Sequence, residues 1–111
     1  MKTVKQLRDT ARSERDRADA LRKDAQTHRD KANAYPIDAD PKYSAAETDQ
    51  AQKLEERAAL HDQTALNSEQ QAAELERQAL ALERQEQDLQ ARTQVEIDKL
   101  EGQKKALRGE A

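Results

Sequence analysis

Apolar residues recur along this chain at alternating spacings of three and four, beginning with its first residues. With Val4 taken as heptad position a, the a and d positions hold Val4, Leu7, Ala11, Glu14, Ala18, Leu21, Ala25, His28, Ala32 and Tyr35. A second series holds Ala51, Leu54, Ala58, His61, Ala65, Ser68, Ala72, Leu75, Ala79, Leu82, Glu86 and Leu89. Spacing of this kind over several heptads predicts two helices that pack as a coiled coil.

A short segment rich in helix-breaking residues separates the two series. Residues 35–44 contain Pro36 and Pro41, and the segment 1–34 before them contains neither Gly nor Pro. Proline cannot continue a helix and disfavours helical geometry in the residue before it. The segment 35–44 is therefore predicted to be a turn.

Capping signals set the expected ends of the helices. Ser44 and Glu47 have the spacing of a capping box, in which each side chain bonds the other residue's backbone N–H, and Thr3 and Gln6 have the same spacing. Gly109 stands where a helix would stop. We expect a single domain with a first helix in 1–34 and a second in 45–108.

The predicted fold is all-α, an antiparallel coiled-coil hairpin whose long second helix overhangs the first over residues 79–108. Closing the turn at 35–43 places Leu21 opposite Ala58 and Leu7 opposite Ala72, so that large side chains face small ones. The residues expected at the hairpin interface are Val4, Leu7, Leu21, Leu54, Ala58, Ala72 and Leu75.

The distribution of charge favours pairing of the two helices. Residues 1–34 carry ten basic and six acidic side chains, whereas residues 44–111 carry nine basic and fifteen acidic ones. Arginines fill the e positions of the first helix and acids those of the second, and e faces e in an antiparallel pair. The expected ion pairs are Arg22–Glu55, Arg15–Asp62, Arg8–Glu69 and, at g, Asp24–Arg57.

A single hairpin leaves apolar residues uncovered on the second helix. A second stripe lies beside the first, and residues 79–108 have no predicted partner within the chain. The residues expected in an oligomer interface are Leu60, Leu66, Leu80, Leu82, Leu89, Ile97, Leu100 and Leu107. We expect a homodimer with a helical bundle and a stalk, although a different protein as partner and either orientation of the overhang remain open.

Composition excludes most kinds of catalytic or cofactor site. The chain has no Cys, two Gly and two His, so thiolate chemistry and Gly-rich phosphate loops are ruled out. His28 and His61 are expected to face Ala51 and Ala18 as interface fillers, too far apart to share a metal. We expect no enzyme activity, no cofactor and no metal. With no apolar run long enough to span a membrane and no signal peptide, the expected location is the cytoplasm.

The turn has a more specific feature. Tyr35-Pro36-Ile37-Asp38-Ala39-Asp40 resembles the aromatic-Pro-acid-x-acid tip of DksA-type regulators and, more loosely, the acidic hairpin tip of Gre factors. The resemblance implies a coiled coil that enters the secondary channel of RNA polymerase, with Tyr35, Asp38 and Asp40 as tip contacts. The chain departs from DksA because it lacks the four-Cys zinc domain, and from Gre because it lacks the C-terminal globular domain.

The leading functional hypothesis is a non-enzymatic structural or adaptor protein that mediates protein–protein assembly as a scaffold, chaperone or accessory factor. The polymerase regulator is the alternative. A lesser alternative is nucleic-acid binding through the arginine row of the first helix, since a basic helix face can contact phosphates. The acidic row expected opposite these arginines argues against it.

Overall fold

The computed structural model describes residues 1–109, which form two helices and no strand. Helix α1 spans Val4–Ala34 and helix α2 spans Pro41–Arg108. The prediction of an all-helical chain with two helices is confirmed. The chain divides into two units, residues 1–74 and the residues from 75 onward, which are described separately below.

The start of α1 is fixed by the predicted capping box. Thr3 Oγ1 accepts a hydrogen bond from the backbone N of Gln6 at 3.1 Å, and Gln6 Oε1 accepts one from the backbone N of Thr3 at 2.9 Å. These two bonds satisfy backbone donors that have no partner inside the helix. The capping box predicted at Thr3 and Gln6 is confirmed.

Helix α2 starts at Pro41, four residues before the predicted position 45. Asp40 Oδ1 accepts a hydrogen bond from the backbone N of Lys42 at 3.0 Å. Asp40 thus caps the helix, and Pro41 occupies the first helical position, where its missing N–H costs nothing. The capping box predicted at Ser44 and Glu47 is wrong, because both residues lie inside α2 and their side chains bond to α1.

The turn between the helices is held by a few local contacts. The backbone N of Ala39 donates to the carbonyl of Pro36 at 3.0 Å. The rings of Tyr35 and Tyr43 stack with centroids 5.9 Å apart and an angle of 25° between their planes. Ser44 Oγ donates to the carbonyl of Ala32 at 3.2 Å. These contacts tie the end of α1 to the beginning of α2.

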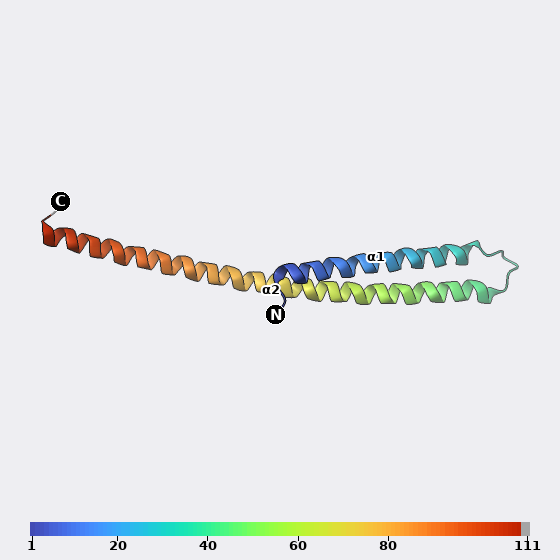
Figure 1. Ribbon diagram of the computed structural model, residues 1–111. Coiled ribbons are helices and arrows are strands. Elements are labelled where there is room, and N and C mark those ends of the chain that lie inside the picture. The colour runs from blue at the N-terminus through green and yellow to red at the C-terminus, as the bar shows by residue number, and fades with distance from the viewer. Residues whose placement is uncertain (110–111) are drawn as a thin grey trace. The chain divides into compact units, whose positions relative to one another are not determined.

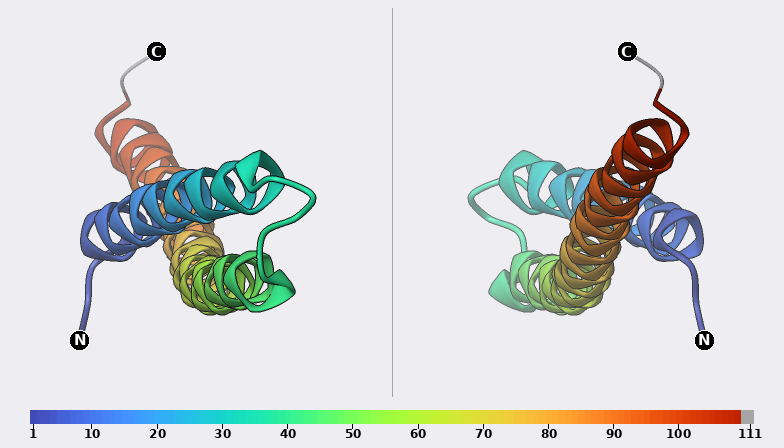
Figure 2. Two further views of the ribbon diagram at one scale, coloured as in Figure 1. Left: turned by 90° about the vertical axis from the view of Figure 1, so that its right-hand side faces the viewer. Right: turned by 90° about the vertical axis from the view of Figure 1, so that its left-hand side faces the viewer.

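Within residues 1–74, α1 and the first half of α2 lie side by side and run in opposite directions (Figures 1 and 2). The direction follows from cross-helix pairs, since Arg15 bonds Glu69 whereas Arg29 bonds Glu55. Every buried side chain lies at an a or d position of the heptads. These residues are Leu7, Ala11, Ala18, Ala25, Ala51, Leu54, Ala58, Ala65, Ser68 and Ala72.

From residue 75 the chain continues as α2 to Arg108 (yellow to red in Figure 1). Gly109 ends the helix with φ of 71°, and its backbone N donates to the carbonyl of Ala106 at 3.2 Å. A left-handed residue after the last turn is a common helix stop, and glycine adopts it without strain. The helix stop predicted at Gly109 is confirmed. All described residues from 76 onward are exposed.

Candidate interaction surfaces

The seam between the helices is built mainly from alanine. Ala25, Ala51 and Leu54 form a buried cluster, against which the partly buried Leu21 packs. Of the residues expected at the hairpin interface, Leu7, Leu54, Ala58 and Ala72 are buried. Val4, Leu21 and Leu75 are partly buried.

A row of ion pairs runs along one side of the seam, in a register that differs from the expected one. Arg15 Nε lies 2.8 Å from Glu69 Oε1, Arg29 Nη2 lies 2.7 Å from Glu55 Oε2, and Arg22 bonds Asp62. The expected pairs were Arg8–Glu69, Arg15–Asp62 and Arg22–Glu55. Arg15 and Arg22 thus each bond the acid one heptad beyond the one expected, and Glu69 bonds Arg15.

The direction of helical side chains explains this register. Side chains in an α-helix lean toward its N-terminus, so side chains on antiparallel helices lean in opposite directions. Where Leu54 packs near Ala25, the side chains of Arg29 and Glu55 lean toward each other, whereas those of Arg22 and Glu55 lean apart. The expected pair Asp24–Arg57 is also not formed, since neither side chain makes a hydrogen bond or ion pair within the described residues.

The pairs change the acidity of the carboxyl groups. The hydrogen bonds from Arg29 lower the pKa of Glu55, and those from Arg15 lower the pKa of Glu69. Both contacts have fork geometry, in which Nε and Nη2 of one arginine donate to the two oxygens of one carboxylate. Such bidentate bonds combine charge with directional specificity.

Acid is therefore expected to weaken the hairpin partly through Glu55. A carboxyl whose pKa is lowered on folding contributes its full stability above its ordinary pKa of 4.5, and loses it as the pH falls through the folded value. In Glu55→Gln we expect a smaller drop in melting temperature between pH 6 and pH 3 than in wild type, measured by circular dichroism. The control Glu56→Gln changes a carboxylate that bonds Gln52 in its own helix, and should match wild type. Equal drops in all three proteins would contradict the prediction.

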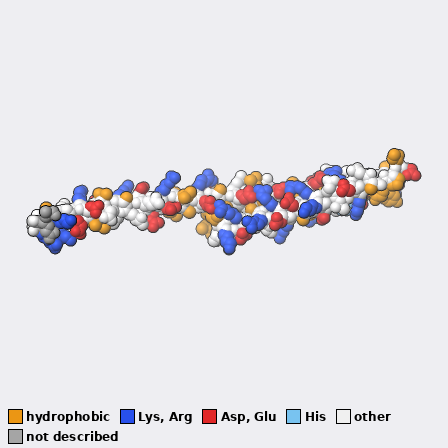
Figure 3. Space-filling model, turned by 90° about the horizontal axis from the view of Figure 1, so that it is seen from above, with side chains coloured by type: hydrophobic (Ala, Val, Ile, Leu, Met, Phe, Trp, Pro, Cys, Tyr) orange, Lys and Arg blue, Asp and Glu red, His pale blue; other side chains and the backbone are white. Residues whose placement is uncertain are grey.

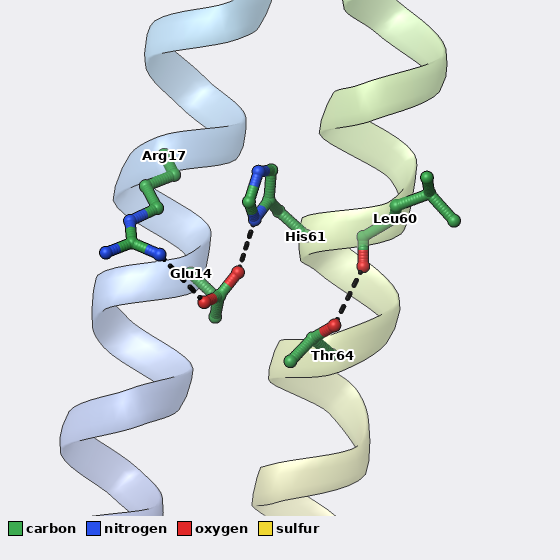
Figure 4. Close-up of polar contacts among 5 residues, drawn as sticks. All are labelled: Glu14, Arg17, Leu60, His61 and Thr64. Atoms are coloured by element: carbon green, nitrogen blue, oxygen red, sulfur yellow. Dashed lines mark hydrogen bonds and ion pairs between the residues drawn. The ribbon is translucent and has the colours of Figure 1, made fainter.

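Two histidine–glutamate pairs cross the seam at d positions. His28 Nδ1 lies 2.5 Å from Glu47 Oε2, and His61 Nδ1 contacts Glu14 Oε2. Figure 4 shows Glu14 between His61 of α2 and Arg17 of its own helix, whose Nη1 lies 3.2 Å from Glu14 Oε1. Both histidines were expected to face alanines, so these two pairs differ from the prediction. The sequence did contain a signal for these pairs. In each pair, the His and the Glu occupy d positions at equal distances along the chain from the middle of the turn.

These polar pairs divide the alanine seam into layers. A polar residue at a core position of a coiled coil specifies register, since sliding one helix would separate the partners. Both pairs are partly buried, which strengthens this preference. Together with the arginine forks, they select one alignment of α1 on α2.

The surface of the hairpin carries both signs of charge. Figure 3 shows basic and acidic side chains interleaved along its visible face. The arginines at positions 15, 22 and 29 bond acids of α2, so the row proposed to contact nucleic acid is engaged within the chain.

The end of the hairpin exposes an apolar and an acidic side chain. Ile37 is fully exposed, and Figure 3 shows hydrophobic side chains gathered at this end. Asp38 makes no hydrogen bond or ion pair within residues 1–109. Asp40 caps α2, and its carboxylate also lies 3.5 Å from Lys42 Nζ. Of the two tip carboxylates, Asp38 is the one that bonds no other side chain or backbone group among residues 1–109.

Large apolar residues are exposed along the second half of α2. Leu89 is 64% exposed and Leu107 89% exposed. The side chains of Leu82, Glu86, Leu89 and Thr93 lie next to one another on the same open side of α2. The exposed large residues from 75 onward are Leu80, Leu82, Leu89, Val95, Ile97, Leu100 and Leu107. Leu60 and Leu66, also expected in an oligomer interface, are exposed in the first half of α2.

The described residues contain no group of three or more His, Cys, Asp or Glu side chains arranged to hold a metal ion. None of the described helices is long and apolar enough to cross a membrane. Comparison of the chain with protein-family models, with curated proteins and with solved structures finds no match.

Proposed function

We propose that this chain is a non-enzymatic adaptor, which assembles proteins through the exposed apolar face on the second half of α2. The observation that supports this function is the exposure of Leu82, Leu89, Ile97, Leu100 and Leu107 on one helix. Several large apolar side chains exposed along one face of a helix commonly mark a protein–protein contact.

The stability of the helix supports the same proposal. An α-helix in water is marginal without tertiary contacts, and residues 76–109 bury no side chain. A partner that covers the apolar face would supply the missing packing. The hairpin of residues 1–74, by contrast, buries its own seam.

A pull-down from the native lysate tests the adaptor role. We expect tagged wild type to capture a defined set of proteins, and Leu89→Glu/Leu100→Glu to lose that set. The matched control Ala91→Glu/Ala106→Glu adds the same charges at exposed positions on other faces of the helix, and should keep the set. Capture of the same proteins by all three baits would contradict the proposal.

The exposed tip supports a second candidate, the polymerase regulator. Ile37 and Asp38 are exposed at the end of the hairpin, where a channel-inserting rod would present them. Asp38→Asn is the sharper variant for this candidate, because Asp40 is needed as a helix cap. As a further bait, Asp38→Asn should lose RNA polymerase subunits under the regulator hypothesis and lose nothing under the adaptor hypothesis.

A further inference from the structure

We propose that the partner of the exposed face is a second copy of this chain, bound antiparallel across a two-fold axis between Gln94 and Val95. The inference rests on the proposed function, since it names the occupant of the same face. It is carried by the self-complementary order of apolar and charged residues along that face.

The face is a straight stripe on α2. At 3.6 residues per turn, positions 82, 86, 89, 93, 97, 100, 104 and 107 fall within an arc of about 80°. The spacing includes two consecutive steps of four residues, from 89 to 93 and from 93 to 97. Steps of this kind keep a stripe nearly parallel to the axis of an undistorted helix. Two straight stripes can therefore face each other over their whole length.

Reversing the stripe reproduces its pattern. About the proposed axis, Leu82 lies opposite Leu107 and Leu89 opposite Leu100. Within one residue of the same alignment, Glu86 lies opposite Lys104. The seam would then contain outer and inner leucine layers with a layer of opposite charges between them at each side of the axis. In the central layers Thr93 faces Ile97, and no like charges face each other.

The flanking charges favour the same arrangement. Residues 81–88 carry three acids and one base, and residues 101–108, which would face them, carry three bases and one acid. On the two sides of the stripe, Glu83 comes near Arg108 and Arg92 near Glu96 of the other copy. A parallel dimer would instead place Glu86 on Glu86 and Lys104 on Lys104, and like charges across an interface oppose association.

Sedimentation equilibrium of the full chain tests the charge pattern. We expect wild type to be a dimer at tens of micromolar, and Glu86→Lys to raise the dissociation constant about tenfold or more. Glu86→Lys/Lys104→Glu should restore dimerisation. The matched control Asp88→Lys makes the same charge change on another face of the helix, and should leave the dimer intact. A monomeric wild type, or a failure of the double exchange to restore the dimer, would overturn the inference.

A distance measurement tests the orientation. The described residues contain no cysteine and the sequence has none elsewhere, so Gln103→Cys accepts one spin label per chain. Across the proposed axis the two labelled positions lie 17 residues apart along the helices, which is about 25 Å, whereas a parallel dimer would bring them to about 10 Å. The short distance would overturn the antiparallel arrangement.

The two proposals can fail separately. A monomeric wild type that still loses its captured proteins in Leu89→Glu/Leu100→Glu would overturn the second copy as occupant and leave the adaptor role standing. If wild type is a dimer, but wild type and Leu89→Glu/Leu100→Glu capture the same proteins, the adaptor role alone is overturned.

Discussion

Replacement of Ala25 by glutamate is expected to lower the free energy of unfolding of the hairpin by about 3 kcal/mol or more. Ala25 is 1% exposed and packs with Ala51 and Leu54. A carboxylate at this position must either lose its hydration without a partner or push the two helices apart. Either outcome removes most of the contribution of the alanine seam to the free energy of unfolding, because the two helices can approach closely only where their facing side chains are small.

Urea unfolding followed by circular dichroism measures this effect. Ala20→Glu is the matched control, because it makes the same substitution in α1 at an exposed position. Its free energy of unfolding should stay within about 0.5 kcal/mol of wild type. Equal stability of the two variants would contradict the placement of Ala25 in the seam.

Shortening Leu54 to alanine is expected to cost about 2 kcal/mol or more of unfolding free energy. Leu54 is 7% exposed and is the one large residue in a cluster otherwise made of alanines and the partly buried Leu21. Its removal leaves a cavity that the small neighbours cannot fill, so both transfer energy and packing are lost.

The comparison with Leu60→Ala separates packing from helix propensity. Leu60 lies in the same helix and is 69% exposed, so its shortening should change the free energy of unfolding by no more than about 0.5 kcal/mol. Thermal and urea unfolding of both variants measure the two changes in the free energy of unfolding. A cost at Leu60 as large as that at Leu54 would show that another surface covers Leu60.

The sequence predicted the two helices because helix boundaries depend on local patterns. Pro36 and Pro41 lie between the two long heptad series and separate them. The buried residues then fall at the a and d positions, since a strict 3–4 spacing leaves one stripe per helix to pack.

The start of α2 was predicted wrongly because Ser44 and Glu47 fit two different patterns. Ser44 and Glu47 have capping-box spacing, yet they also continue the a and d series, and in the structure they serve the seam. Asp40 followed by Pro41 was the stronger start signal, because it combines a capping side chain with proline at the first helical position.

The ion-pair register could not be read from heptad letters alone. Positions e face e in an antiparallel pair, but this rule does not say which heptads meet. The choice depends on the lean of the side chains, which brings Arg29 to Glu55 rather than Arg22 to Glu55. The second half of α2 buries no side chain within the described residues, so the order of charges along its face is the one guide to a partner that the sequence offers.

The stacked tyrosines at the turn give the protein an internal optical reporter. Tyr35 and Tyr43 are the only aromatic residues of the chain apart from the histidines, and their rings meet where α1 passes into α2. Near-ultraviolet absorption and tyrosine fluorescence therefore originate from the tip of the hairpin, where Tyr35 caps α1 and Tyr43 lies in the first turn of α2, whereas far-ultraviolet ellipticity reports on both helices. Opening of the turn and melting of the helices can be followed separately in one unlabelled sample, and the interval between the two transitions measures how cooperatively the hairpin closes.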